Sequence, residues 1–289
     1  MRRFRNIVVV PLTNRPEAPP ALREAVALAR TSGAELRILG HMPSPRPCET
    51  SLDLEELRQF LEASTAAHAE RLAGWARDVG EPGLHIDVAS GSLPLDVATS
   101  VRDSGHDLVV IASDDSPESA AAARRILRSC PCPVWLTRPS FTGSRVLAAI
   151  DPDHGTERNQ LILELASSQA ELHNGALSVI HAWDLPTGAA GEGTPTGLGR
   201  SGLSTLASAV EAAHNSAFAA AMGEVSFAVP PTTHLVDGSP ARAIRGLSVL
   251  YRSDLLVVGA GAWNTPELGL GSTTEQVVAE SESSVLVVR

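Results

Sequence analysis

The chain has 289 residues, and its 43% hydrophobic and 19% charged composition is typical of a globular protein large enough for two domains. A formal net charge of -10 argues against a nucleic-acid-binding protein, which usually carries a basic face. All 23 basic residues are arginine, which excludes Schiff-base catalysis on lysine and the lysine-dependent phosphate loop of P-loop enzymes.

Five short apolar runs in the first half of the chain predict β-strands. The segments between them have helical period, most clearly at residues 21–30 and 54–76. Because runs such as "IVVV" and "LVVI" are continuously apolar, they are typical of parallel strands that are buried on both faces. The five runs are "RNIVVVPLTN" (5–14), "AELRILGHM" (34–42), "LHIDVASGS" (84–92), "HDLVVIAS" (106–113) and "CPVWLTR" (132–138).

The second half repeats this order, with its clearest helical segment at residues 203–222. Strands that alternate with helices imply right-handed βαβ crossovers. We therefore expect an α/β fold with two doubly wound, five-stranded parallel sheets in tandem, of the Rossmann-like, adenine-nucleotide-binding-like class. A linker at "RPSFTG" places the boundary near Phe141, with domains at 1–140 and 141–289. The matching runs are "SRVLAAIDPD" (144–153), "GALSVIHAW" (175–183), "THLVDGS" (233–239), "SDLLVVGA" (253–260) and "SSVLVVR" (283–289).

One stretch of the second half, "VVGAGAWNTPELGLGSTTEQVV" (257–278), follows a predicted strand and opens a helix. Open α/β sheets bind ligands beyond the carboxyl ends of their strands, where the strand order reverses. If the first and fourth strands are neighbours, that crevice is lined by the ends of "RVLAAID" and "DLLVVG". Glycines let the backbone approach an anion closely, and Gly271-Ser272-Thr273 would present helix-start N–H groups and hydroxyls. Asp151 could accept hydrogen bonds from an adenine amino group or a ribose hydroxyl.

Each of these features also suits an ordinary structural role. Gly271-Ser272 also suits a plain helix N-cap, and Asp151 before Pro152 suits a turn. Their joint occurrence at one predicted crevice favours a nucleotide site.

Two cysteines, Cys130 and Cys132, flank a proline, but they lack the two-residue spacer and the second ligand pair of a metal site. We expect them to precede and begin a buried strand. Three cysteines in all make no disulfide framework, and no apolar run reaches membrane-spanning length. We therefore expect a cytoplasmic protein with no membrane or nucleic-acid partner.

The remaining polar candidates favour structural roles. His181 and His234 lie in predicted strands and are expected to be framework histidines. The glycine-rich segment 185–202 is expected to be a loop, with a mobile lid as the alternative. No nucleophile–base–acid constellation is evident, which favours a binding protein over an enzyme. A solvated helix face is expected for Arg124, Arg125 and Arg128.

The segment "DLLVVGAGAWNTPELGLGSTTEQVVAESESSVLVVR" (254–289), together with "RVLAAIDPD" (145–153), resembles the universal stress protein family. "HDLVVIASDDSPES" and "ILRSCPCPVWLTRPS" resemble the degenerate first domain of tandem universal stress proteins of the E type. The resemblance covers nearly the whole chain. It implies that the two domains form a pseudo-dimer, in which the apolar edge runs 134–137 and 285–288 lie side by side about a pseudo-twofold axis, and a homodimer of tandem chains is the further option.

The resemblance also assigns roles to residues of the second half. Asp151 would hold adenine or ribose. Ala149, Ala182 and Val258 would line the base. The phosphates would meet Gly259, Gly271, Ser272 and Thr273.

The family pattern is Gly, two residues, Gly, nine residues, then Gly-Ser or Gly-Thr. Gly259 fits the first place, but Ala262 stands at the second, and Gly261 lies one residue early. Gly271-Ser272 arrives one residue sooner than the pattern asks. These departures concern the phosphate end of such a site and leave its adenosine end less affected.

The first half departs further from the pattern. Leu12 takes the place of Asp151 and Ala112 that of Gly259. The loop after Ala112 offers carboxylates, which would repel an anionic ligand. Nucleotide is therefore expected in the second half only. The carboxylates are those of Asp114, Asp115 and Glu118.

The function that the resemblance implies is stress-linked binding of an adenine nucleotide, ATP or AMP, with any ATP hydrolysis slow and incidental. No metal site is expected beyond nucleotide-associated Mg²⁺. The alternative is a scaffold without nucleotide, or a protein that binds an apolar metabolite. A hydrolase that uses adenylate chemistry is a third reading, for which a fold alone is no support.

Overall fold

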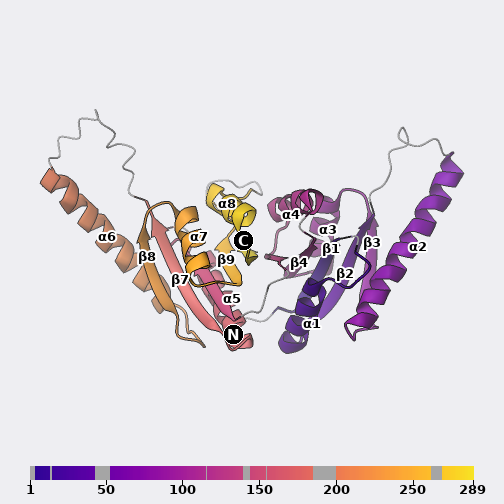
Figure 1. Ribbon diagram of the computed structural model, residues 1–289, viewed down its shortest axis with the longest axis horizontal. Coiled ribbons are helices and arrows are strands. Elements are labelled where there is room, and N and C mark those ends of the chain that lie inside the picture. The colour runs from indigo at the N-terminus through magenta and orange to yellow at the C-terminus, as the bar shows by residue number, and fades with distance from the viewer. Residues whose placement is uncertain are drawn as a thin grey trace. The chain divides into compact units, whose positions relative to one another are not determined.

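The computed structural model (Figure 1) describes residues 4–13, 15–42, 53–114, 116–138, 144–153, 155–184, 200–261 and 269–289. The chain divides into two compact units, mainly Arg3–Pro139 and Ser140–Pro266 with Leu270–Val288. They are called here the N-terminal and the C-terminal unit. The boundary expected near Phe141 lies outside the described residues.

The N-terminal unit contains a parallel sheet with strand order β3-β2-β1-β4-β5. Helices α1 and α2 pack on strands β1 to β3, and Figure 1 shows α2 alongside β3. Helices α3 and α4 pack on each other. The strands are β1 (Asn6–Leu12), β2 (Glu35–Met42), β3 (His85–Ser90), β4 (Leu108–Ser113) and β5 (Val134–Thr137). The helices are α1 (Pro20–Ser32), α2 (Leu54–Asp78), α3 (Leu93–Ser104) and α4 (Pro117–Ser129).

The C-terminal unit has the same arrangement, with strand order β10-β9-β6-β7-β8. Helix α5 packs on the sheet and on α6, whereas α7 and α8 pack together. The strands are β6 (Arg145–Ala149), β7 (Ala176–Trp183), β8 (Thr232–Asp237), β9 (Leu255–Gly259) and β10 (Ser284–Val288). The helices are α5 (Thr156–Leu172), α6 (Arg200–Gly223), α7 (Pro240–Leu250) and α8 (Ser272–Glu280). The doubly wound α/β fold expected from the sequence is thus confirmed.

Local sequence accounts for many of the element ends. Helix α2 begins with a capping box, in which Asp53 accepts hydrogen bonds from the backbone of Glu56 and the Glu56 side chain bonds back to Asp53. Proline stands in the first turn of α1, α3, α4 and α7, where its missing N–H costs nothing. The central strands β1, β4, β6 and β9 are buried over most of their length, because both faces of each sheet carry helices.

The two units share a polar feature that marks the internal repeat. The carboxylate of Asp107 accepts hydrogen bonds from the backbone N–H groups of Arg5 and Asn6, at the start of β1. Asp254 does the same for Ser144 and Arg145, at the start of β6. This match places Asn6 at the position of Arg145 and so sets the alignment between the units.

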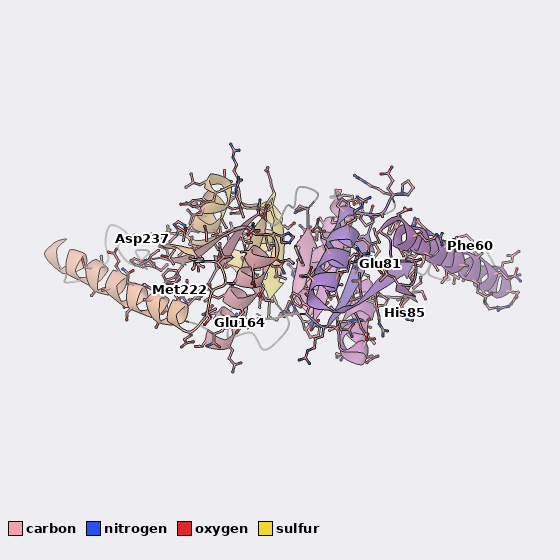
Figure 2. All side chains as sticks on the ribbon, turned by 90° about the horizontal axis from the view of Figure 1, so that it is seen from below. Phe60, Glu81, His85, Glu164, Met222 and Asp237 are labelled. Atoms are coloured by element: carbon pink, nitrogen blue, oxygen red, sulfur yellow. The ribbon has the colours of Figure 1, made fainter. Side chains whose placement is uncertain are left out.

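The loop expected at 185–202 ends earlier than predicted. Its residues up to 199 lie outside the described residues, but Arg200–Gly202 belong to α6. This helix begins before the periodic apolar residues from which it was predicted. None of the described helices is both long and apolar enough to cross a membrane. Figure 2 shows Phe60 near one end of α2, where it is 56% exposed.

Candidate functional site

A cavity of about 530 Å³ opens at the carboxyl ends of β6, β7 and β9 and at the start of α8. This is where a doubly wound sheet presents its ligand crevice, since β6 and β9 are neighbours but their crossovers run to opposite sides. The size is ordinary for a small-molecule pocket. Nine residues singled out from the sequence line this one cavity: Ala149, Asp151, Ala182, Val258, Gly259, Gly261, Gly271, Ser272 and Thr273. The tenth, Ala262, lies outside the described residues.

The loop after β9 passes very close to the start of α8. Gly261 has φ +125°, and a Cβ atom there would lie 2.0 Å from the Gly271 nitrogen. Only glycine fits this place, because an added side chain would be strained and would overlap the backbone. The local structure therefore requires glycine at position 261, one residue before the position where the family pattern has its second glycine.

The start of α8 is partly committed to bonds within the protein. The Gly271 N–H donates to the carbonyl of Ala260 at 2.9 Å, and the Thr274 hydroxyl donates to the Gly259 carbonyl at 2.6 Å. Gly271 therefore does not offer its N–H to a ligand. The N–H groups and hydroxyls of Ser272 and Thr273 belong to the first turn, where backbone donors have no intrahelical acceptor.

Arg158, in the first turn of α5, is a residue of the cavity that the sequence analysis did not single out. Its Nη1 donates to the Gly261 carbonyl at 2.6 Å, and its side chain touches the face of Gly259. Its buried Nε atom has no hydrogen-bond partner among the described residues. Among the residues that line the cavity, all from the described part of the chain, Arg158 is the one arginine. It places a positive charge beside the glycine loop.

The Asp151 backbone is held by a side chain from the same helix. Asn159 Oδ1 accepts from the Asp151 N–H at 3.1 Å, and Asn159 Nδ2 donates to the Asp151 carbonyl at 2.6 Å. Asn159 is only 4% exposed, whereas Asp151 is exposed at the cavity mouth. The carboxylate of Asp151 is thus on a fixed backbone at the edge of the crevice.

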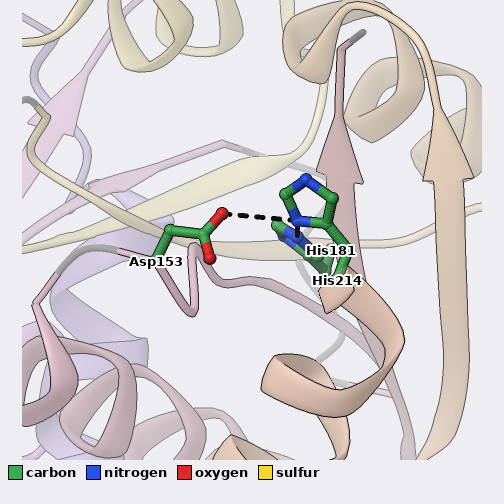
Figure 3. A group of neighbouring side chains, drawn as sticks. All are labelled: Asp153, His181 and His214. Carbon is green, nitrogen blue, oxygen red and sulfur yellow. Dashed lines mark hydrogen bonds and ion pairs between the residues drawn. The ribbon is translucent and has the colours of Figure 1, made fainter. Parts of the chain in front are cut away.

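Three further side chains gather at one end of the same cavity (Figure 3). His181 comes from β7, Asp153 from the turn after β6, and His214 from α6. His181 Nε2 lies 3.0 Å from His214 Nδ1, which lies 3.3 Å from Asp153 Oδ2. Burial lowers the pKa of His181 below its usual value, because the charged form loses hydration. The sequence analysis treated His181 as a framework residue and missed His214, whose signal is a lone histidine in an alanine-rich helix.

The sequence pattern of the universal stress protein family matches residues 4–138 and again residues 143–289. The chain belongs to the universal stress protein family. It is 25% identical over 309 residues to universal stress protein E of Escherichia coli K12, covering 100% of this chain and 95% of that relative. The tandem organisation of the family pattern agrees with the resemblance found in the sequence.

Solved structures support the same fold. A functionally unknown protein from Pseudomonas aeruginosa superposes with a TM-score of 0.67 at 20% identity, covering 99% of this chain and 92% of that one. A universal stress protein from Archaeoglobus fulgidus superposes with a TM-score of 0.62 at 15% identity, covering 98% of both chains. At these identities the likeness concerns the fold.

The N-terminal universal stress protein unit differs at the equivalent place. Strand register puts Leu12 at the position of Asp151 and Ala112 at that of Gly259. In the following loop, the Asp114 carboxylate accepts a hydrogen bond from the backbone N–H of Ser116 at 3.1 Å. Hydrogen bonds from Ser116 are the main reason why the pKa of Asp114 is lowered. The Asp114 carboxylate therefore takes up the backbone N–H of Ser116, just before α4. Asp115 lies outside the described residues.

The other candidates from the sequence lie away from the cavity. Cys130 and Cys132 are buried just before β5, with their Sγ atoms 3.6 Å apart. His234, in β8, packs against the ring of Tyr251, and its Nε2 has no hydrogen-bond partner among the described residues. The exposed face of α4 carries Arg124, Arg125 and Arg128.

Proposed function

We propose that this universal stress protein binds one adenine nucleotide, ATP or AMP, in the cavity of its C-terminal unit. The observation that carries the proposal is the convergence of nine residues, chosen from the sequence alone, on a single cavity at the switch point of the sheet. These residues come from three strands, two loops and a helix start, and the topology of the sheet brings them to one edge, where an acceptor carboxylate, glycines and helix-start donors face the same cavity.

The charges around the cavity support an orientation for the ligand. Asp151, at one end, carries the hydrogen-bond acceptors that an adenine amino group or ribose hydroxyls require. Arg158 and the first turn of α8, at the glycine loop, supply a positive charge and backbone donors for phosphate. The adenosine end would therefore lie towards β6 and the phosphates towards α8.

We also propose that the protein acts by binding and not by turnover, in stress-linked sensing or protection. No described residue pairs a nucleophile with a base at the expected phosphate end, where the cavity is lined by glycine, serine, threonine and Arg158. Any hydrolysis of ATP would be slow. The N-terminal unit would bind no nucleotide, since Leu12 and Ala112 stand at the positions of Asp151 and Gly259.

The test is a calorimetric titration of the full chain with AMP and with ATP in the presence of a metal chelator. We expect one nucleotide per chain. Asp151→Ala should abolish binding without lowering the free energy of unfolding, because the side chain is exposed. Asp114→Ala, the matched change in the N-terminal unit, should leave affinity and stoichiometry unchanged.

Three results would overturn the proposal. Absence of any heat or thermal shift with both nucleotides would favour the scaffold, or a protein that binds an apolar metabolite. Loss of binding in Asp114→Ala but not in Asp151→Ala would place the site in the N-terminal unit instead of the C-terminal unit. Turnover of ATP that is fast compared with nucleotide release would favour an enzyme.

A further inference from the structure

Hydrogen bonds within the protein do not satisfy every acceptor atom of the cluster formed by Asp153, His181 and His214. Each of the three residues offers one possible ligand atom, and these three atoms all lie within 4.8 Å of one another. His181 Nδ1 lies 3.2 Å from the Ile150 carbonyl, which can only accept, so this nitrogen carries the proton of the neutral ring. His181 Nε2 then presents a lone pair to the cavity.

The cluster therefore has two acceptors and at most one proton between them. His181 Nε2 and the Asp153 carboxylate both face His214 Nδ1, at 3.0 Å and 3.3 Å. A ring nitrogen carries one proton at most, whether the imidazole is neutral or charged. A single N–H cannot point at two acceptors with good geometry. A cation at the centre of the three atoms would satisfy all of them.

The spacing of these atoms suits a small divalent ion. Ligand atoms about 2.0–2.1 Å from a tetrahedral Zn²⁺ lie roughly 3.3 Å from one another. Two of the three separations, 3.0 Å and 3.3 Å, are close to this value. The ligands come from a strand, a turn and a helix, so their approach is produced by the tertiary fold.

The surroundings have the features of a supported metal site. The bond from His181 Nδ1 to the Ile150 carbonyl fixes the ring orientation and the tautomer, as outer-shell partners do for metal-bound histidines. The ring of His214 stacks on Trp183, with centroids 4.8 Å apart. His181 is 2% exposed, whereas Asp153 lies at the open side, through which an ion could enter.

The N-terminal unit provides an internal comparison. The strand register places Gly40 at the position of His181. A Cβ atom at Gly40 would lie 2.8 Å from His68 Nε2, so a helix histidine fills the space that a strand side chain would need. The N-terminal unit thus has a histidine on the equivalent helix without the strand histidine, and the cluster exists only in the C-terminal unit among the described residues.

We propose that Asp153, His181 and His214 bind a divalent cation of the Zn²⁺ class at the β7 end of the cavity. Two imidazoles and one carboxylate favour Zn²⁺ over Mg²⁺ or Ca²⁺, which prefer oxygen ligands alone. Three protein ligands leave a fourth position open to the cavity, where water or a ligand atom completes the coordination. The site goes beyond the proposed function, and it does not depend on nucleotide binding.

The experiment uses the full chain, stripped of metal and free of nucleotide, and titrated with Zn²⁺ against a chromophoric chelator. We expect one tightly bound Zn²⁺ per chain and a rise in the midpoint of thermal unfolding. Asp153→Asn and His214→Gln should each weaken binding by at least about 100-fold, because even outer-shell partners contribute 10–100-fold. Bound Co²⁺ should give the visible absorption of a tetrahedral site in the unaltered chain and lose it in both variants.

The control is a surface histidine–aspartate pair in the N-terminal unit. His85 Nε2 lies 3.1 Å from Asp87 Oδ1, with both side chains more than half exposed (Figure 2 labels His85). His85→Gln should leave Zn²⁺ affinity and stoichiometry unchanged. Asp153→Asn keeps the test valid if His214→Gln fails to fold, since the Asp153 side chain is 45% exposed.

Three results would overturn the proposal. The first is absence of stoichiometric Zn²⁺ binding, in which case the cluster is a hydrogen-bonded network only. The second is unchanged affinity in both Asp153→Asn and His214→Gln. The third is an equal loss in His85→Gln, which would indicate surface binding. Because the nucleotide titration uses chelator and this one uses no nucleotide, either proposal can fail without the other.

Discussion

Asn159 holds Asp151 by both of its amide atoms, through an N–H···O bond of 3.1 Å to Oδ1 and a bond of 2.6 Å from Nδ2 to the carbonyl. The two residues are eight positions apart, one after β6 and the other in α5. This pair joins the loop at the mouth of the cavity to α5, and it holds the backbone from which the Asp151 carboxylate extends.

Replacing Asn159 with alanine should destabilise the protein. The change removes two hydrogen bonds to the Asp151 backbone, and a hydrogen bond contributes about 0.5–1.5 kcal/mol on average. Urea denaturation measures the effect. Gln160→Ala, which removes an exposed bond to Glu224, should change the free energy of unfolding by less than about 0.5 kcal/mol. Equal stabilities of the two variants would show that the Asn159 bonds contribute nothing.

Arg158→Gln should weaken binding at the phosphate end of the proposed nucleotide site and leave binding at the adenosine end unchanged. The guanidinium lies at the glycine loop, so we expect the affinity for AMP to fall by about 10-fold, the value of one charge-assisted hydrogen bond, with adenosine affinity unchanged. Parallel titrations with AMP and adenosine measure the difference. A parallel loss for both ligands would indicate that Arg158 supports the loop and does not contact phosphate.

Gly261→Ala should lower the free energy of unfolding by about 1–3 kcal/mol, because the backbone conformation is strained for alanine and the Cβ overlaps Gly271. The matched variant is Gly246→Ala in α7, where an added Cβ meets nothing within 4 Å. It should stabilise the helix by about 0.5–1 kcal/mol. Thermal and urea unfolding of both variants give the comparison. Stabilisation by Gly261→Ala would contradict the close approach of the loop to α8.

Stability should fall as the pH is lowered from 7.5 to 5. Besides that of His181, burial lowers the pKa of four further histidines, His68, His106, His173 and His234. Their pKa values return to about 6.5 in the unfolded chain. Below this pH the unfolded chain binds more protons than the folded chain, so the free energy of unfolding rises with pH in this range. The stabilisation is complete above about pH 6.5 and is lost as the pH falls below it.

Urea denaturation in the presence of chelator, at several values between pH 5 and 7.5, measures this dependence. A free energy of unfolding that is constant or increases towards pH 5 would contradict the assignment of these histidines as neutral in the folded protein.

The pairing of Val134–Thr137 with 285–288 stays a prediction. Each segment forms the outer strand of the sheet in its own unit, and an open edge leaves backbone groups unpaired. If the two edges pair, the amides of 134–137 should exchange with solvent as slowly as those of β1. Leu286→Pro, which removes a donor, should accelerate exchange at 134–137. Fast exchange of alternate amides at 134–137 in the unaltered chain would contradict the pairing.

The sequence by itself determined the repeated α/β fold and the position of the crevice. Apolar runs such as "LVVI" and "LLVV" occur because both faces of these strands are buried, so they identify strands whatever the details of side-chain packing. Asp151 and the glycine loop could be placed at the crevice because they follow strands whose neighbours the topology dictates. These signals are local in the chain.

Only the tertiary structure decided which side chains meet there. Arg158 reaches Gly261 across 103 positions, and His181 meets His214 across 33 positions. Neither approach has a sequence signature, because it depends on the length of a loop and on the rotation of a helix about its axis. The same holds for Gly271, whose N–H is taken up by Ala260 once the loop closes on α8. Side chains far apart in the chain find each other through packing, and packing is a property of the whole unit.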